Sequence, residues 1–154
     1  MNHLHPSAVD ALSLSDEDRI RYILGDRWIG YAAANDALAN LNRLLTQPKV
    51  YRMPNRLLVS DTNNGKTSLL RRFVQLNDRA DDPRLEAATI PILLVQAPPV
   101  PDERRFLASL LDGLGMPHAA SQRTELLFRQ VQTVLPRLGV RMLIIGRSCR
   151  KPIW

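Results

Sequence analysis

Residues 60–67 of the chain, Ser60-Asp61-Thr62-Asn63-Asn64-Gly65-Lys66-Thr67, decide the fold. They match the phosphate-loop pattern G-x-x-x-x-G-K-[ST] at every fixed position except the first, where serine replaces glycine. In this pattern Gly65 lets the chain approach a phosphate, Lys66 carries a charge for the β and γ phosphates, and Thr67 offers a hydroxyl to Mg²⁺. The sequence therefore predicts binding of ATP and Mg²⁺. The predicted contacts are Ser60, Asn63, Asn64, Gly65, Lys66, Thr67 and Ser68, with Thr67 at the metal.

The neighbouring sequence separates this interpretation from a chance Gly-Lys-Thr tripeptide capped by Asn63 or Asn64. The apolar run 57–59 before the loop predicts a strand, and apolar residues at helical spacing follow from residue 69. Strand, loop and helix in this order favour the phosphate loop. If the first loop position needs a backbone angle that only glycine adopts readily, Ser60 costs about 1 kcal/mol there.

Further apolar runs at 90–96 and 140–145 suit strands that are covered on both faces. Three buried strands separated by helices imply an α/β fold, with a parallel sheet and helices on both faces. The stretch before Ser15 reads as polar and loose, and Ser15 reads as the N-cap of a short helix. Other helices are predicted from Asn35 to before Pro48, from Asp102 to Leu114 and over 123–138. The expected organisation is a helical segment at 1–50, a partial P-loop core at 51–145 and an aberrant basic tail at 146–154.

Composition narrows the class of protein. The chain has 154 residues, 45% of them hydrophobic, which is enough for one domain with a core. A single cysteine, Cys149, excludes an internal disulfide, and we see neither a leader nor an apolar run that could span a membrane, so a cytoplasmic protein is expected. The net charge is +6, but residues 137–154 contribute five of these charges, so the charge is weak evidence for a DNA partner.

Five blocks of sequence occur in a specific order: Asp26–Tyr31, Arg52–Asn55, Thr62–Thr67, Pro98–Glu103 and Val140–Ile145. Together and in this order, they resemble the TniB proteins. These are AAA+ type ATPases that regulate transposition in bacterial mobile elements and are related to the TnsC and IstB groups. The resemblance covers nearly all of residues 3–145 and implies a P-loop NTPase core of the AAA+ type, ATP-dependent assembly on DNA, and contact with a DDE-type transposase.

The resemblance also implies that the segment before the first strand lies over the adenine. This makes Trp28, Ile29 and Tyr31 candidates for adenine contact. Packing of Trp28 and Tyr31 under the helices is an equal alternative, because aromatic side chains are mostly found in cores.

The resemblance ends after Ile145. A strand of this kind should end in Asp-Glu, which orders Mg²⁺ and positions the attacking water, but here Gly146-Arg147 follows. We interpret this as a C-terminal truncation by a frameshift or an element boundary. Hydrolysis should then be very slow, and missing strands should leave an exposed strand edge and an uncovered apolar face.

Two functions stay open at this point. The first is an ATP-binding regulator of DNA transposition without the Walker B acids, whose status as an enzyme is undecided. The second is a non-enzymatic module in which residues 1–55 dock a transposase or a full-length homologue. A degenerate remnant without a function is a further possibility. The expected partners are the transposase of the same element, DNA and full-length homologues in an oligomer, with no membrane.

Overall fold

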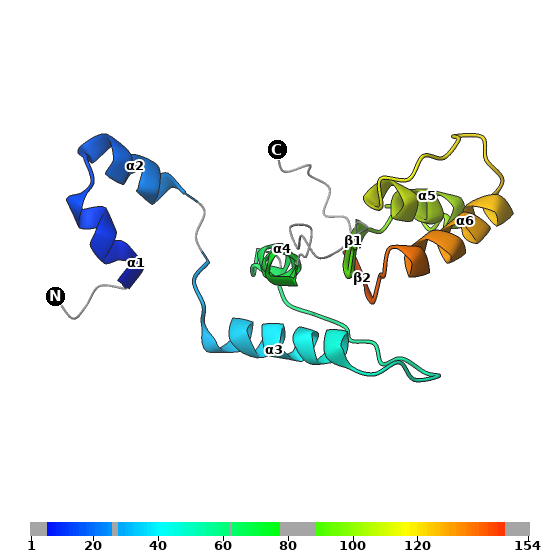
Figure 1. The fold of residues 1–154 in the computed structure, drawn as a ribbon, viewed down its shortest axis with the longest axis horizontal. Helices are drawn as coiled ribbons and strands as arrows, with labels where there is room; N and C mark the ends of the chain where they lie inside the picture. Colours follow the sequence, from blue (N-terminus) through cyan, green and yellow to red (C-terminus); the bar gives the residue numbers. More distant parts are fainter. Residues whose placement is uncertain (1–5, 26–27, 62, 78–88, 147–154) are drawn as a thin grey trace. The chain divides into compact units, whose positions relative to one another are not determined.

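The computed structural model describes residues 6–25, 28–61, 63–77 and 89–146 (Figure 1). The contacts divide the chain into two compact units, Met1–Tyr31 and Ala32–Trp154. Each unit is described by itself.

The N-terminal unit is helical from Pro6. It contains α1 (Pro6–Val9), the 3₁₀ turn η1 (Asp10–Ser13) and α2 (Asp16–Leu24). The prediction of a loose stretch before Ser15 was therefore wrong for residues 6–13, and residues 1–5 lie outside the described part. One local bond that holds the turn is donated by the Ser13 hydroxyl to the Asp10 carbonyl at 2.8 Å. The N-cap prediction is confirmed, since Ser15 Oγ accepts a hydrogen bond from the backbone N–H of Asp18.

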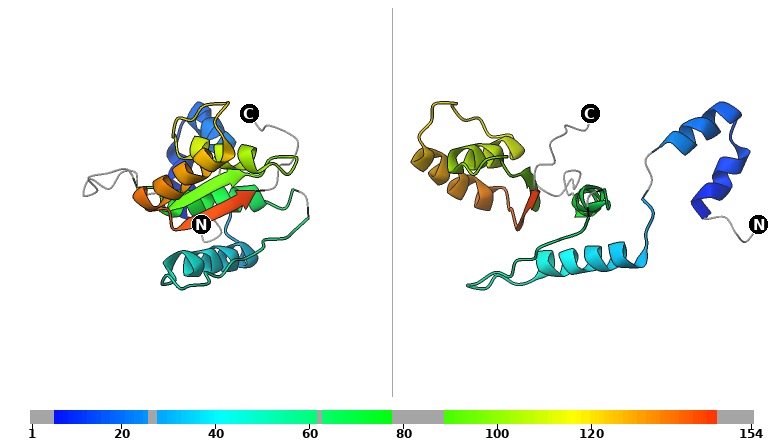
Figure 2. Two further views of the ribbon diagram at one scale, coloured as in Figure 1. Left: turned by 90° about the vertical axis from the view of Figure 1, so that its right-hand side faces the viewer. Right: turned by 180° about the vertical axis from the view of Figure 1, so that it is seen from behind.

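The second unit contains a two-stranded parallel sheet in the part of the chain that is described. β1 (Ile92–Gln96) pairs with β2 (Met142–Gly146) in a register that runs from Ile92 opposite Met142 to Gln96 opposite Gly146. Figure 2 shows the two strands side by side. The helices of this unit are α3 (Ala32–Thr46), α4 (Lys66–Asn77), α5 (Glu103–Gly113) and α6 (Thr124–Arg137).

Helices pack on both faces of β1, as predicted. Because side chains alternate along a strand, Leu93 and Val95 point to one face and meet α5 and α6, where Leu111 is fully buried. On the opposite face Ile92 packs with Leu45 of α3 and Phe73 of α4. Burying each such side chain stabilises the fold by about 1.5–3 kcal/mol.

The contacts of α3 set the boundary between the units. This helix lies within the helical segment expected at residues 1–50, whereas the contact division falls after Tyr31. Leu45 of α3 is 8% exposed because it packs against Phe73 and Ile92, so the apolar face of α3 belongs to the core around the sheet.

Two expectations about the strands were wrong. The run 57–59 belongs to neither strand of the described sheet, and its side chains are exposed, with Leu57 84% accessible. A strand needs a neighbour to pair its N–H and C=O groups, and apolar character alone does not provide one. β2 is also not covered on both faces, because Leu143 and Ile145 are exposed. This does confirm the expectation of an uncovered apolar face.

Candidate functional site

The loop before α4 turns through two residues in the left-handed region. Asn63 has φ 62° and Gly65 has φ 70°, and α4 begins directly afterwards with Leu69 N–H donating to the Gly65 carbonyl at 2.9 Å. A Cβ built on Gly65 would have no neighbouring atom within 4 Å, so the space beside it is open to a ligand. Ser60 does not have a positive φ, so the backbone cost considered for a serine at this position does not arise.

The ammonium group of Lys66 lies inside the loop. Its Nζ atom donates to the Ser60 carbonyl at 2.7 Å, the Asp61 carbonyl at 2.7 Å and the Ser60 hydroxyl at 3.0 Å. A lysine ammonium has three donors and no acceptor, so these three bonds use its whole capacity. The side chain is therefore fixed in the loop at the first residue of α4.

The start of α4 favours an anion. The first N–H groups of a helix lack partners within the helix and carry partial positive charge, and the first turn of α4 contains no acidic residue. Thr67 and Ser68 in this turn are exposed, as are Asn63 and Asn64 in the loop. The structure thus brings the predicted phosphate contacts together around one helix start. Thr62 lies outside the described residues.

The predicted adenine contacts belong to the other unit. Ile29 is 79% exposed and Tyr31 54% exposed, whereas Trp28 is half-buried. Within its own unit, the ring of Tyr31 is not packed in a core. Since the two units are described separately, an adenine contact by Ile29 and Tyr31 stays a prediction.

The carboxyl end of β2 carries no acidic side chain in the described residues. β2 ends at Gly146, whose carbonyl accepts from the N–H of Ala97 at 2.8 Å, and Arg147 lies outside the description. The described residues also contain no group of three or more His, Cys, Asp or Glu side chains that could hold a metal. A metal contact by Thr67 therefore stays a prediction.

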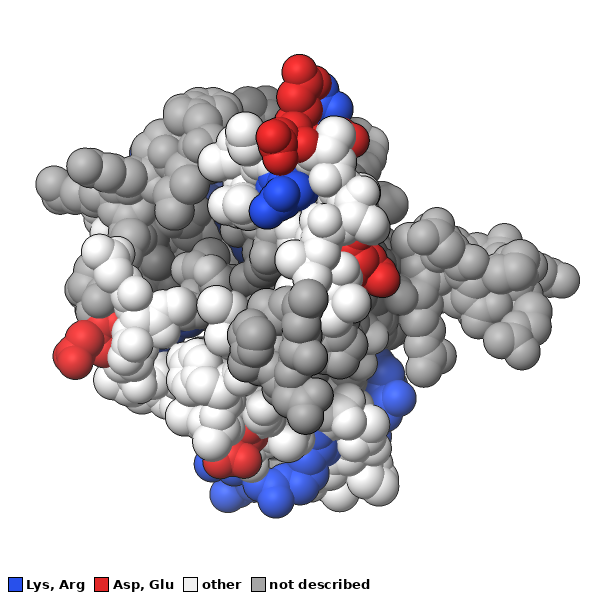
Figure 3. Space-filling model, turned by 90° about the vertical axis from the view of Figure 1, so that its left-hand side faces the viewer, with Lys and Arg blue, Asp and Glu red and all other residues white. Residues whose placement is uncertain are grey.

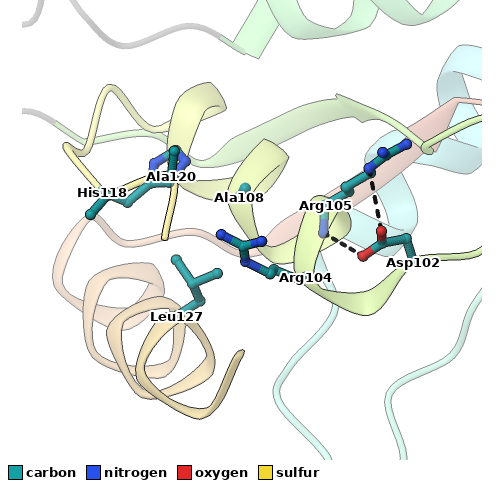
Figure 4. Close-up of a pocket in the computed structure, with 8 residues that line it drawn as sticks. Asp102, Arg104, Arg105, Ala108, His118, Ala120 and Leu127 are labelled. Atoms are coloured by element: carbon teal, nitrogen blue, oxygen red, sulfur yellow. Dashed lines mark hydrogen bonds and ion pairs between the residues drawn. The ribbon is translucent and has the colours of Figure 1, made fainter. Parts of the chain in front are cut away.

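A cavity of about 280 Å³ lies where α5 begins, and the sequence analysis did not predict it (Figure 4). Its charged groups already have partners: Arg105 pairs with Asp102 at 3.3 Å, and Arg104 Nε donates to the Gln122 carbonyl at 3.1 Å. His118 Nδ1 lies 3.6 Å from Asp112 Oδ1. In the sequence, the adjacent arginines 104 and 105 are the feature that could have indicated this cavity. Because their side chains are paired with neighbouring groups, the lining of the cavity points to no particular ligand.

The described charged side chains on the face shown in Figure 3 are of both signs, and acidic side chains lie among the basic ones. Most of the excess positive charge in the sequence lies in residues 137–154, and residues 147–154 are outside the described part.

The fold and the loop together define a small α/β unit with a parallel sheet and a Gly-Lys-Thr loop at a helix start. The family model described as "Bacterial TniB protein" matches residues 19–146, which is most of the chain. The chain therefore belongs to the TniB family, and membership implies a regulatory role in transposition. Comparison with curated proteins and with solved structures gave no significant match. Among the described helices, none has the length and apolar character to cross a membrane.

Proposed function

We propose that this protein is an ATP-binding regulator of DNA transposition with a P-loop of the AAA+ type at residues 60–67. The observation that carries the proposal is the position of Lys66, whose ammonium is held within the loop at the first residue of α4. A fixed positive charge beside free helix N–H groups is the arrangement that binds phosphates.

Each part of the loop has a task in this proposal. The backbone N–H groups of the loop and of the first turn of α4 hold the β-phosphate, while Gly65 leaves room for it. Lys66 neutralises charge between the β and γ phosphates, and the exposed Thr67 hydroxyl contacts Mg²⁺. Bound Mg²⁺ supplies charge neutralisation on the phosphates. Ile29 and Tyr31 are the proposed adenine contacts.

Turnover should be slow because the residues after the apolar part of β2 are Gly146 and Arg147 instead of a pair of acids. In the described part of this strand end, no acidic side chain is present to position a water or to order the coordination of Mg²⁺. In the proposal ATP therefore acts as a ligand that favours one assembly state. The proposed partners are the transposase of the same element, DNA and further copies of TniB proteins.

Measurement of Mg-ATP binding by the full chain tests the proposal. We expect saturable binding that Lys66→Ala weakens at least tenfold, because hydrogen bonds to charged groups are lost together with the charge. Lys49→Ala is the matched control, since Lys49 is an exposed lysine outside the loop and its loss changes the net charge equally. Absence of Mg-ATP binding in folded protein, or equal affinity in the wild type and Lys66→Ala, would overturn the proposal.

One observation favours the docking module as a second candidate. Ile20, Ile23 and Leu24 lie on one face of α2 and are 58%, 70% and 80% exposed. An apolar helix face of this kind suits a protein partner. Pull-down of the cognate transposase with and without Mg-ATP separates the two candidates, because a docking module predicts capture that does not depend on nucleotide.

A further inference from the structure

The third bond of Lys66 exists because serine occupies the first position of the loop. The carbonyls of Ser60 and Asp61 are backbone groups that any residue would supply, but the acceptor at 3.0 Å is the Ser60 side chain. With the glycine that the pattern specifies, two acceptors would remain and one N–H of the ammonium would be free for a phosphate oxygen.

We propose that the Ser60 hydroxyl competes with the nucleotide for Lys66. In the nucleotide-free protein it holds the third N–H of the ammonium, and it releases this N–H when the β and γ phosphates bind. The proposal rests on the proposed ATP binding and assigns to Ser60 a positioning role that lowers affinity.

Release of this bond is local. The serine hydroxyl can rotate among staggered conformations about one side-chain torsion, so the loop backbone keeps its shape. The Lys66–Ser60 pair is partly buried, so water does not fully screen the bond. Hydrogen bonds to charged groups are stronger than neutral ones, and giving up this bond should weaken nucleotide binding by about tenfold.

The test compares the affinity of the full chain for Mg-ATP and Mg-ADP in the wild type and three variants. Ser60→Ala removes the hydroxyl and should bind both nucleotides about tenfold more tightly. Ser60→Gly restores the pattern and should change affinity in the same direction. Ser60→Thr keeps a hydroxyl and should stay close to the wild type. If Ser60→Thr binds nucleotide as the wild type does, the change in Ser60→Ala is due to the lost hydrogen bond and not to a general effect of altering the loop. Circular dichroism checks that each variant is folded.

The outcomes also separate this inference from the proposed function. If the wild type binds Mg-ATP through Lys66 while Ser60→Ala binds equally or less tightly, competition by Ser60 is wrong and the ATP site stands. If Ser60→Thr gains as much affinity as Ser60→Ala, the hydroxyl is not the cause. Absence of Lys66-dependent binding in the wild type and in all variants overturns both.

Discussion

Leu93 and Leu143 occupy paired positions on the two neighbouring parallel strands, yet Leu93 is 2% exposed and Leu143 is 39% exposed. The difference arises because α5 and α6 cover β1 and do not extend over β2. Leu93→Ala should therefore lower the free energy of unfolding by about 2–5 kcal/mol, as for other buried leucines. Leu143→Ala should cost about 1 kcal/mol or less, because a half-exposed side chain gains only part of the burial energy.

Urea unfolding followed by circular dichroism measures this difference. The two variants remove the same atoms from the same register position, so each is the control for the other. Equal losses of stability would mean that the exposed face of β2 is covered in solution, for example by another copy of the chain.

The helices from α2 onward were predictable from the sequence because their signals are local, whereas α1 and η1 were not predicted. Ser15 and Asp102 cap the helices that follow them, and apolar spacing identified α3 to α6. Strands depend on residues distant in the chain, and the predictions were wrong for two of them. Residues 57–59 have the composition of a strand but join neither strand of the described sheet, and β2 lacks the second covering layer expected from its apolar run.

The candidate site shows the same limit. The pattern identified Lys66 and Gly65, and the structure brings them to one helix start with the left-handed angle at Gly65 that a glycine there suggests. The bond from Lys66 to the Ser60 hydroxyl was not predictable, because it depends on the path of the loop as well as on residue type. Serine was read only as an imperfect match to glycine, although its side chain adds an acceptor.

The N-cap of α5 gives a second stability prediction. Asp102 Oδ1 accepts the backbone N–H of Arg105 at 2.9 Å, and Asp102 Oδ2 lies 3.3 Å from Arg105 Nε. Asp102→Ala should lower the free energy of unfolding by about 0.5–2 kcal/mol through loss of the cap. Asp102→Ser keeps a capping oxygen and should restore most of this loss. Arg105→Ala should cost much less, since the ion pair is solvent-exposed. A larger loss in Arg105→Ala than in Asp102→Ala, in the same unfolding experiment, would assign the energy to the ion pair instead.

Any side chain at Gly65 should lower the affinity for Mg-ATP. Its φ of 70° is unfavourable for alanine by about 1–2 kcal/mol, and a Cβ would enter the open space beside the loop. Gly65→Ala should therefore weaken Mg-ATP binding, measured by titration calorimetry. Gly25→Ala is the control, because Gly25 has φ −66° and its Cβ would meet only ordinary contacts at 3.5 Å and beyond. Unchanged affinity in Gly65→Ala would show that the phosphates do not lie beside this residue.

Thr67 should make nucleotide affinity depend on Mg²⁺. Its side chain is exposed in the first turn of α4, one residue after Lys66, and its hydroxyl is the metal contact expected of this loop. Thr67→Val keeps the shape and the branching of the side chain but removes the hydroxyl, so the gain in ATP affinity on adding Mg²⁺ should fall by about tenfold. Thr67→Ser retains the hydroxyl and should keep the gain. Affinities measured with Mg²⁺ and with EDTA in its place give the comparison, and affinity in EDTA should be the same for all three proteins because the metal is absent. If Thr67→Val responds to Mg²⁺ as the wild type does, the metal is held by other groups and Thr67 is only a helix residue.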